Sequence, residues 1–153
     1  MSRIRSQQYA LTAYDLVKNV KIEKEQGKKE LAEGYRTLAL NFPNMILQSG
    51  LCQAVGFLLA KGTEDDENGK KSEKNAHFVL LLKHLTKLLN DNDETDALLL
   101  NDNDKTDAFH KHILECDLDK YQLLTRNTLE AASWLKRYTQ ALLPKDNDGD
   151  KHV

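Results

Sequence analysis

Cysteine, proline and glycine are all scarce in this chain of 153 residues, which contains two, two and seven of them respectively. The two cysteines, Cys52 and Cys116, are too few for a disulfide framework, as expected of a protein from a reducing cytoplasm. So few prolines and glycines exclude a collagen-like or broadly disordered chain. No apolar run approaches the ~20 residues of a membrane helix, and the polar N-terminus lacks the apolar stretch of a secretory signal. We therefore expect one soluble, cytoplasmic domain that does not enter a membrane.

The net charge of -2 conceals a separation of acidic from basic residues. Three acidic stretches, residues 63–73, 90–107 and 144–153, contain 15 of the 24 acidic residues but only 5 of the 22 lysines and arginines. The rest of the chain therefore has 17 basic against 9 acidic residues, a balance of +8. A basic body of this kind attracts polyanions, although an ordinary solvated surface would have the same composition.

Hydrophobic residues recur with the helical period along most of the chain, and no segment alternates convincingly with the period of two that a strand needs. The predicted helices span residues 3–26, 28–42, 43–61, 72–89, 106–115 and 118–143. Gly27, Pro43 and Pro144 are expected to end helices or begin new ones, and Asp117 is expected to cap the last helix. These features predict an all-α fold, a compact single-domain bundle of about six helices.

The third predicted helix contains two glycines, Gly50 and Gly56, each of which costs about 1 kcal/mol relative to alanine. We interpret both as sites where another helix approaches closely. Gln53 and Phe57 lie beside the apolar stripe of this helix, so they either contact a neighbouring subunit or flank the core. Trp134, late in the last helix, is interpreted first as a core or subunit-contact residue and second as a platform for base stacking.

Acidic, turn-rich segments interrupt the helical pattern. Asn90-Asp-Asn-Asp-Glu-Thr-Asp-Ala recurs after 11 residues as Asn101-Asp-Asn-Asp-Lys-Thr-Asp-Ala, which indicates a tandem duplication within a connecting loop. An EF-hand calcium loop does not fit from Asp91, where Asp96 takes the sixth position that needs glycine, nor from Asp146, where the sequence ends before the twelfth position. We expect a helical bundle over residues 1–143 with acidic loops at about 63–73 and 90–107. Residues 144–153 are expected to be a disordered acidic tail.

Residue types that carry catalysis or bind metals do not form a recognised motif. His112 and Cys116 are four apart on a predicted helix and could share a face with His110 nearby, but a structural zinc needs four ligands. The sequence has no phosphate-binding glycine loop and no inward Glu-x-x-His pair. We therefore expect a protein that is not an enzyme and holds no metal or cofactor. A metal-dependent hydrolase using His110, His112 and Cys116 is the least favoured alternative.

Basic side chains on the outer faces of several predicted helices are the candidates for binding a polyanion. Scattered cations of this kind supply phosphate contacts without base specificity. Alternatively, each of these residues is an ordinary solvent-exposed charge with no binding role. The candidate residues are Lys18, Lys21, Arg36, Lys83, Lys87, Lys136 and Arg137.

Two segments carry a family resemblance. The first runs from Tyr35 to Ala60 and combines a helix, a proline corner at Pro43 and a Gly-Leu-x-Gln-Ala-x-x-Phe run that starts at Gly50. The second leads from Tyr121 to Trp134-Leu-Lys-Arg. Together they resemble the small-subunit family of the type III-B CRISPR RNA-targeting complex, known as the Cmr complex. The chain departs from that family's pattern at Ser49, where asparagine is common, at Cys52, where glycine is common, and in its acidic duplication.

The resemblance implies a non-catalytic subunit of an RNA-guided effector. Copies of it would stack as a minor filament beside the other Cmr-complex subunits and help to hold the guide RNA and target RNA through phosphates. Gln53, Phe57 and Trp134 would then be subunit contacts. The alternative is a stand-alone helical adaptor that binds a protein partner and no RNA.

Overall fold

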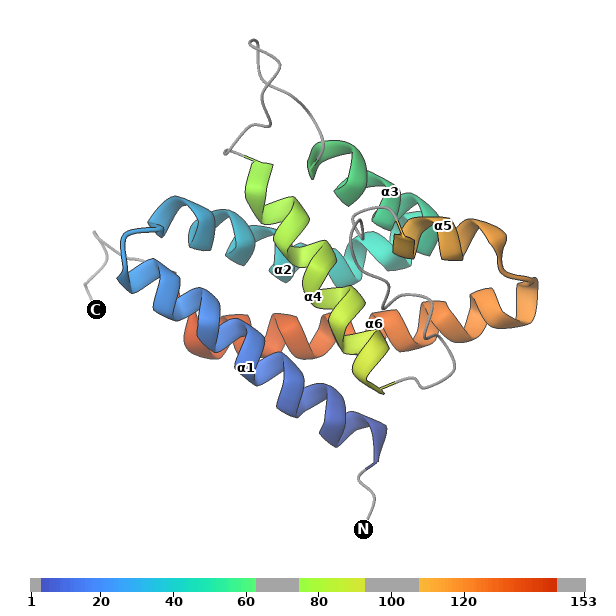
Figure 1. Ribbon diagram of the computed structural model, residues 1–153, viewed down its shortest axis with the longest axis horizontal. Coiled ribbons are helices and arrows are strands. Elements are labelled where there is room, and N and C mark those ends of the chain that lie inside the picture. Colours follow the sequence, from blue (N-terminus) through green and yellow to red (C-terminus); the bar gives the residue numbers. More distant parts are fainter. Residues whose placement is uncertain (1–3, 63–74, 93–107, 146–153) are drawn as a thin grey trace.

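A computed structural model describes residues 4–62, 75–92 and 108–145, which form six helices and no strand (Figure 1). The helices are α1 (Arg5–Glu25), α2 (Lys29–Ser49), α3 (Leu51–Gly62), α4 (Ala76–Asn92), α5 (Ala108–Glu115) and α6 (Leu118–Leu142). The predicted all-α bundle is therefore confirmed. The first residues of the helix predicted over 72–89, most of the two acidic loops and nearly all of the acidic tail lie outside the described residues. None of the helices in the described part is both long and apolar enough to cross a bilayer.

Helices α2 and α6 pack against each other and run antiparallel across the width of the molecule (Figure 1). Helix α1 crosses α6 diagonally, and α4 crosses in front of both α2 and α6. Helices α3 and α5 lie against each other at one end of the bundle. One hydrophobic core therefore connects elements from the beginning, middle and end of the chain.

Local sequence signals set several helix ends as predicted. Gly27 follows α1 with a φ of 105°, and the Lys28 N–H donates to the Glu23 carbonyl at 2.9 Å, a bond typical of a glycine-terminated helix. At the start of α6 the Asp117 carboxylate accepts a hydrogen bond from the Lys120 N–H at 2.9 Å. Asp117 satisfies one of the free amides that every helix N-terminus leaves.

The predicted corner at Pro43 is wrong, because α2 continues through this proline to Ser49. A proline inside a helix removes one backbone hydrogen bond and costs about 3 kcal/mol. On either side of it, Phe42 and Ile46 are almost completely buried, and burial of such side chains stabilises by about 1.5–3 kcal/mol each. Continuing the helix keeps both side chains in the core, which offsets the cost of the proline.

The chain turns instead at Gly50, which lies between α2 and α3 with φ 88° and ψ 159°. This conformation is accessible almost only to glycine. Gly50 was expected inside a helix at a close approach, so that interpretation is also wrong. Gly56 does mark a close approach: a Cβ built on it would lie 3.3 Å from the Cε1 of His110 on α5.

The core is built from the inward faces of all six helices. Its largest fully buried side chains are those of Tyr9, Tyr35, Phe42 and Phe109. Along α6, a seam of side chains is buried at Leu124, Thr128, Ala131 and Leu135 and continues to Thr139. Because α6 contacts α1, α2 and α4, this seam holds the two halves of the chain together.

Two hydrogen bonds connect α2 and α3 to opposite ends of α6. The Cys52 N–H, in the first turn of α3, donates to the Tyr121 hydroxyl at 3.1 Å. At the other end, the Arg36 Nε donates to the Leu143 carbonyl just beyond α6 at 2.8 Å. Both bonds satisfy backbone groups that the ends of helices leave unpaired.

Replacing Tyr121 by phenylalanine should reduce the free energy of unfolding by about 1 kcal/mol, because the Cys52 amide loses its hydrogen-bond partner. Chemical denaturation followed by circular dichroism would measure the loss. Tyr14→Phe is the matched control, since the Tyr14 ring is 40% exposed. Equal stability of the Tyr121 variant and the wild type would show that water replaces the hydroxyl without cost.

Candidate nucleic-acid interface

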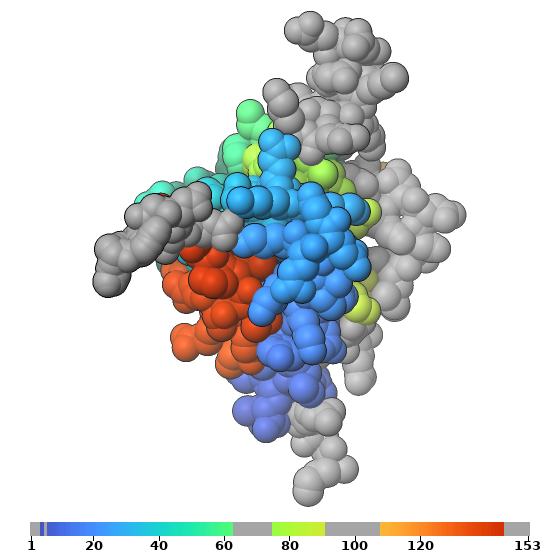
Figure 2. Space-filling model, turned by 90° about the vertical axis from the view of Figure 1, so that its left-hand side faces the viewer, coloured from blue at the N-terminus to red at the C-terminus, as the bar shows by residue number. Residues whose placement is uncertain are grey.

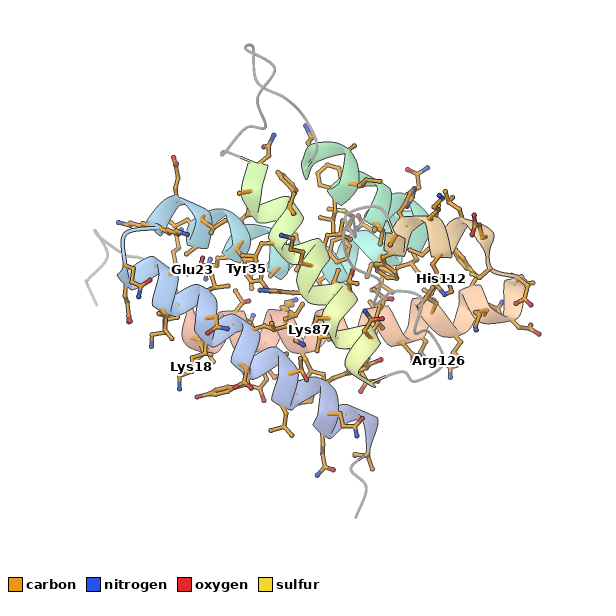
Figure 3. All side chains as sticks on the ribbon, in the orientation of Figure 1. Lys18, Glu23, Tyr35, Lys87, His112 and Arg126 are labelled. Atoms are coloured by element: carbon orange, nitrogen blue, oxygen red, sulfur yellow. The ribbon has the colours of Figure 1, made fainter. Side chains whose placement is uncertain are left out.

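The seven basic residues predicted to bind a polyanion lie on four helices. Lys18, Lys21, Lys83, Lys87 and Arg137 are exposed, whereas Arg36 and Lys136 are half-buried. Figure 3 labels Lys18 on α1 at the lower left and Lys87 on α4 near the centre, on the helix that crosses in front. The structure does not unite all seven in one cluster but separates them into smaller groups.

The first group joins α1 to α6 through three aromatic rings, those of Tyr14, Tyr138 and Trp134, which we call the aromatic row. The Tyr14 ring meets the Tyr138 ring edge-on, with centroids 5.4 Å apart and planes at 82°. The Tyr138 ring stacks on the Trp134 ring at 5.6 Å, with planes at 25°. Tyr14 is 40% exposed and the other two rings are half-buried, so the row is part of the surface.

A cation lies over each end of the aromatic row. The Lys18 Nζ is 5.9 Å from the centroid of the Tyr14 ring, and the Arg137 Cζ is 5.9 Å from that of Trp134. Such contacts stabilise by about 0.5–1 kcal/mol at exposed sites and hold the charged group over the ring. Two residues that are 119 positions apart in sequence, Lys18 and Arg137, thereby belong to one surface.

A cavity of about 410 Å³ opens beside the aromatic row, between the first half of α1 and the end of α6. Tyr14 and Tyr138 form one side of it, and Leu11, which is 52% exposed, lies on another. Among the described side chains that line it, only that of Asp15 is charged. The surface therefore combines exposed apolar area, ring faces and two ordered cations.

The remaining basic candidates form separate groups. Lys83 and Lys87 are one helical turn apart on the exposed face of α4, whose other face is buried. Arg36 lies near the end of α6, where its Nε donates to the Leu143 carbonyl. Lys136 is half-buried next to Arg137 in sequence.

With this geometry in view, comparison with known proteins is informative. Residues 5–142 match the family model described as CRISPR-associated protein (Cas_Cmr5). The chain belongs to the Cmr5 family. A curated relative, "CRISPR system Cmr subunit Cmr5" of Thermus thermophilus, is 33% identical over 141 residues, which cover 92% of this chain and 97% of the relative. The family resemblance drawn from the sequence is thus confirmed.

The Cmr5 assignment extends to the three-dimensional structure. A crystal structure of a CRISPR-associated Cmr5 family protein from Thermus thermophilus matches with a TM-score of 0.64 at 29% identity. The match covers 92% of this chain and 98% of the other. The antiparallel α2–α6 pair and the helices crossing it therefore belong to a fold observed in another Cmr5 protein.

The residues expected at subunit contacts lie on two separate parts of this Cmr5 chain. Gln53 is exposed, and Phe57 is 37% exposed with its ring edge-on to Phe78 at 5.6 Å. Both lie on the outer face of α3, where a neighbour could reach them. Trp134 is instead in the second half of α6, within the aromatic row.

The residues of the metal alternative, His110, His112 and Cys116, all lie on or directly after α5. The Cys116 Sγ donates to the Ile113 carbonyl at 3.4 Å, and His110 packs against Gly56. Within the described part of this Cmr5 chain, no three His, Cys, Asp or Glu residues gather closely enough to hold a metal ion. Nothing in that part supports the hydrolase alternative.

Sequence reasoning selected Lys18, Trp134 and Arg137 but not the two tyrosines that join them. Neither Tyr14 nor Tyr138 was singled out as a binding residue. The signal was present, because Tyr14 precedes Lys18, and Trp134 precedes Tyr138, by the four residues that bring helical side chains together. The contact between the two pairs depends on the crossing of α1 over α6.

Sequence reasoning also missed a buried polar pair in the core of this Cmr5 chain. The Tyr35 hydroxyl and the His84 Nδ1 share a hydrogen bond of 2.8 Å between α2 and α4, near the label of Tyr35 in Figure 3. Removal from water, together with the nearby charge of Lys83, lowers the pKa of His84 to about 4. Burial also raises the pKa of Tyr35 above its ordinary range. Both groups are therefore neutral at physiological pH.

Proposed function

We propose that this chain is the small subunit of a type III-B Cmr RNA-guided effector and that it has no catalytic activity of its own. It stacks with further copies of itself as a minor filament beside the other subunits. Within the assembly it helps to hold guide and target RNA through contacts to phosphates. Membership of the Cmr5 family supports the first part, and the surface of α1 and α6 supports the last.

The observation that carries the RNA contact is the aromatic row with a cation at each end. Lys18 and Arg137 are exposed, and the rings restrict where their charges lie. Phosphate contacts of this kind are independent of base sequence, as a subunit that serves many guide RNAs requires. The neighbouring ring faces of Tyr14 and Trp134 add surface on which an unpaired base could stack.

A tagged pull-down from the native host tests the assignment to a complex. The expected result is recovery of the other Cmr subunits together with short guide RNAs. Recovery of a different, defined protein partner without RNA would instead support the helical adaptor and overturn the proposal. The exposed face of α3 around Gln53 and Phe57 would then be the first surface to examine.

Reversing both charges of the row, Lys18→Glu with Arg137→Glu, should weaken RNA binding by the reconstituted complex. If each residue contacts one phosphate, the slope of log affinity against log salt should fall by about 1.5 per subunit. Filter binding at several salt concentrations would measure it.

The matched control is Lys61→Glu with Lys111→Glu, which reverses two exposed charges on α3 and α5. This variant should retain the wild-type slope, and both variants should retain the helical circular dichroism signal. Equal RNA affinity of the row variant and the wild type, in complexes of the same composition, would remove the α1/α6 surface from the proposal.

A further inference from the structure

A second, smaller cavity lies where α1 ends, α2 begins and α6 ends. Its volume is about 260 Å³, and its polar lining comes from Lys24 of α1, Glu33, Arg36 and Thr37 of α2, and Lys145 beyond α6. Figure 2 shows this side of the molecule, with the end of α6 in red beside the blue of α1 and α2. Three segments that are distant in sequence thus supply one lining.

Arg36 is held in one orientation at this cavity. Its Nε donates to the Leu143 carbonyl at 2.8 Å, and the side chain is half-buried. A guanidinium group has five N–H donors in a rigid plane, so a bond at Nε fixes where the two terminal nitrogens point. The Leu143 carbonyl is the one hydrogen-bond partner that the described residues give Arg36. Within the described part of the chain, the donors of its terminal nitrogens remain for a ligand.

The charges around the cavity favour an anion. Lys24, Arg36 and Lys145 carry three positive charges, and Glu33 carries one negative charge, which leaves +2. The C-terminal end of α6 contributes about half a negative charge through its helix dipole, which reduces the net positive charge. The hydrogen bond from Arg36 to the Leu143 carbonyl neutralises part of that negative charge. Lys24 has an interaction partner of its own, and without its charge Arg36, Lys145 and Glu33 still leave the cavity with +1.

The size of the cavity restricts the anion to a small group. Pockets for drug-sized ligands have volumes of about 300–1,000 Å³, and this one is smaller. Arginine recognises phosphate through paired N–H donors, while lysine adds charge without demanding a fixed geometry. An oriented arginine that shares a cavity with two lysines matches a tetrahedral phosphate better than a flat or apolar group.

We propose that the cavity formed by Arg36, Lys24 and Lys145 binds a single phosphate group. The group belongs either to the backbone of RNA, in which case the inference rests on the proposed function, or to a free nucleotide. In the first case the cavity adds a contact at the end of the bundle to those of the aromatic row. In the second it makes the subunit responsive to nucleotide.

Titrating the isolated, full-length chain with inorganic phosphate tests the cavity directly. Nitrogen-15 NMR should show saturable shifts of the Arg36 Nε–H and of the amides of Leu143 and Lys145. Arg36→Lys keeps the positive charge but loses the paired N–H donors of the guanidinium group. It should therefore weaken phosphate binding by about tenfold or more. Lys145→Gln should weaken it less, because lysine contributes charge alone.

The matched control, Lys61→Gln with Lys111→Gln, removes two exposed charges elsewhere and should bind phosphate within about twofold of the wild type. NMR shifts spread over all basic residues would contradict the proposed phosphate site. Equal phosphate affinity of the wild type and Arg36→Lys would also contradict it. Arg36 also donates a hydrogen bond to the Leu143 carbonyl at the end of α6, so its substitution could alter the fold. Lys145 is exposed, and Lys145→Gln tests phosphate binding without removing that hydrogen bond.

Two further measurements separate the sources of the phosphate. If a 5′-mononucleotide binds clearly more tightly than both inorganic phosphate and the corresponding nucleoside, the ligand of the cavity is a free nucleotide. A salt slope for RNA that falls by about 1 when Lys145→Gln is present in the complex identifies RNA. Failure of phosphate to bind would leave the pull-down and the aromatic-row variants unaffected, so the proposed function is judged independently.

Discussion

Lowering the pH from 7 to 4 should cost the folded chain about 3 kcal/mol of stability through His84 alone. In the unfolded chain the pKa of this histidine is close to 6.5, whereas in the core burial lowers it to about 4. Between these values the unfolded state binds the proton and the folded state does not. The stabilisation is therefore complete above pH 6.5 and is lost as the pH falls from 6.5 through 4.

Denaturant unfolding at several pH values from neutral down to the folded-state pKa would measure the effect. His84→Gln cannot titrate, so its stability should depend less steeply on pH than that of the wild type. Tyr35→Phe removes the hydrogen-bond partner but leaves the histidine buried, and it should keep most of the wild-type dependence. Carboxylates contribute equally to all three proteins. Identical dependences in the wild type and His84→Gln would contradict the assignment.

Replacing Gly50 by alanine should reduce the free energy of unfolding by about 2–3 kcal/mol. The φ of 88° and ψ of 159° at this position lie in a region that an L-residue enters only with strain of this order. Crowding is not the cause, because the added Cβ would meet nothing closer than the Tyr121 hydroxyl at 3.8 Å. The strain falls on the corner that directs α3 away from α2.

Urea denaturation followed by circular dichroism would measure the Gly50 effect. Ser49→Ala is the matched control: it changes the exposed neighbouring residue without requiring a positive φ, and should stay within about 0.5 kcal/mol of the wild type. A Gly50→Ala protein as stable as the wild type would show that the turn has a second, unstrained conformation.

The helices themselves could be predicted from the sequence because their signals are local. The terminator at Gly27 and the cap at Asp117 depend on residues within one turn, and both are confirmed. The corner between α2 and α3 depends on a competition that a single chain segment does not reveal. Pro43 carries a strong local signal for a break, but the burial of Phe42 and Ile46 outweighs it. The turn then moves to Gly50, seven residues further on.

The candidate interface could be predicted only in part for the same reason. Surface cations such as Lys18 and Arg137 follow from helical periodicity, and the family follows from the segments around Gly50 and Trp134. The Arg36 bond joins positions 107 apart in sequence. The grouping of Lys18 with Arg137, and of Arg36 with Lys145, depends on how α1 and α2 pack against α6. Such crossings are set by packing of the whole bundle, which has no local signature.

The packing of α1 on α6 has a consequence for how the chain folds during synthesis. The Ser6 hydroxyl donates to the Glu130 carboxylate at 2.7 Å across a sequence separation of 124 residues. At about 5–20 residues per second, the ribosome needs about 6–25 s to make the intervening chain. Throughout that interval α1 can pack against α2 and α4, but the side of α1 that faces α6 has no partner until the last helix has been made.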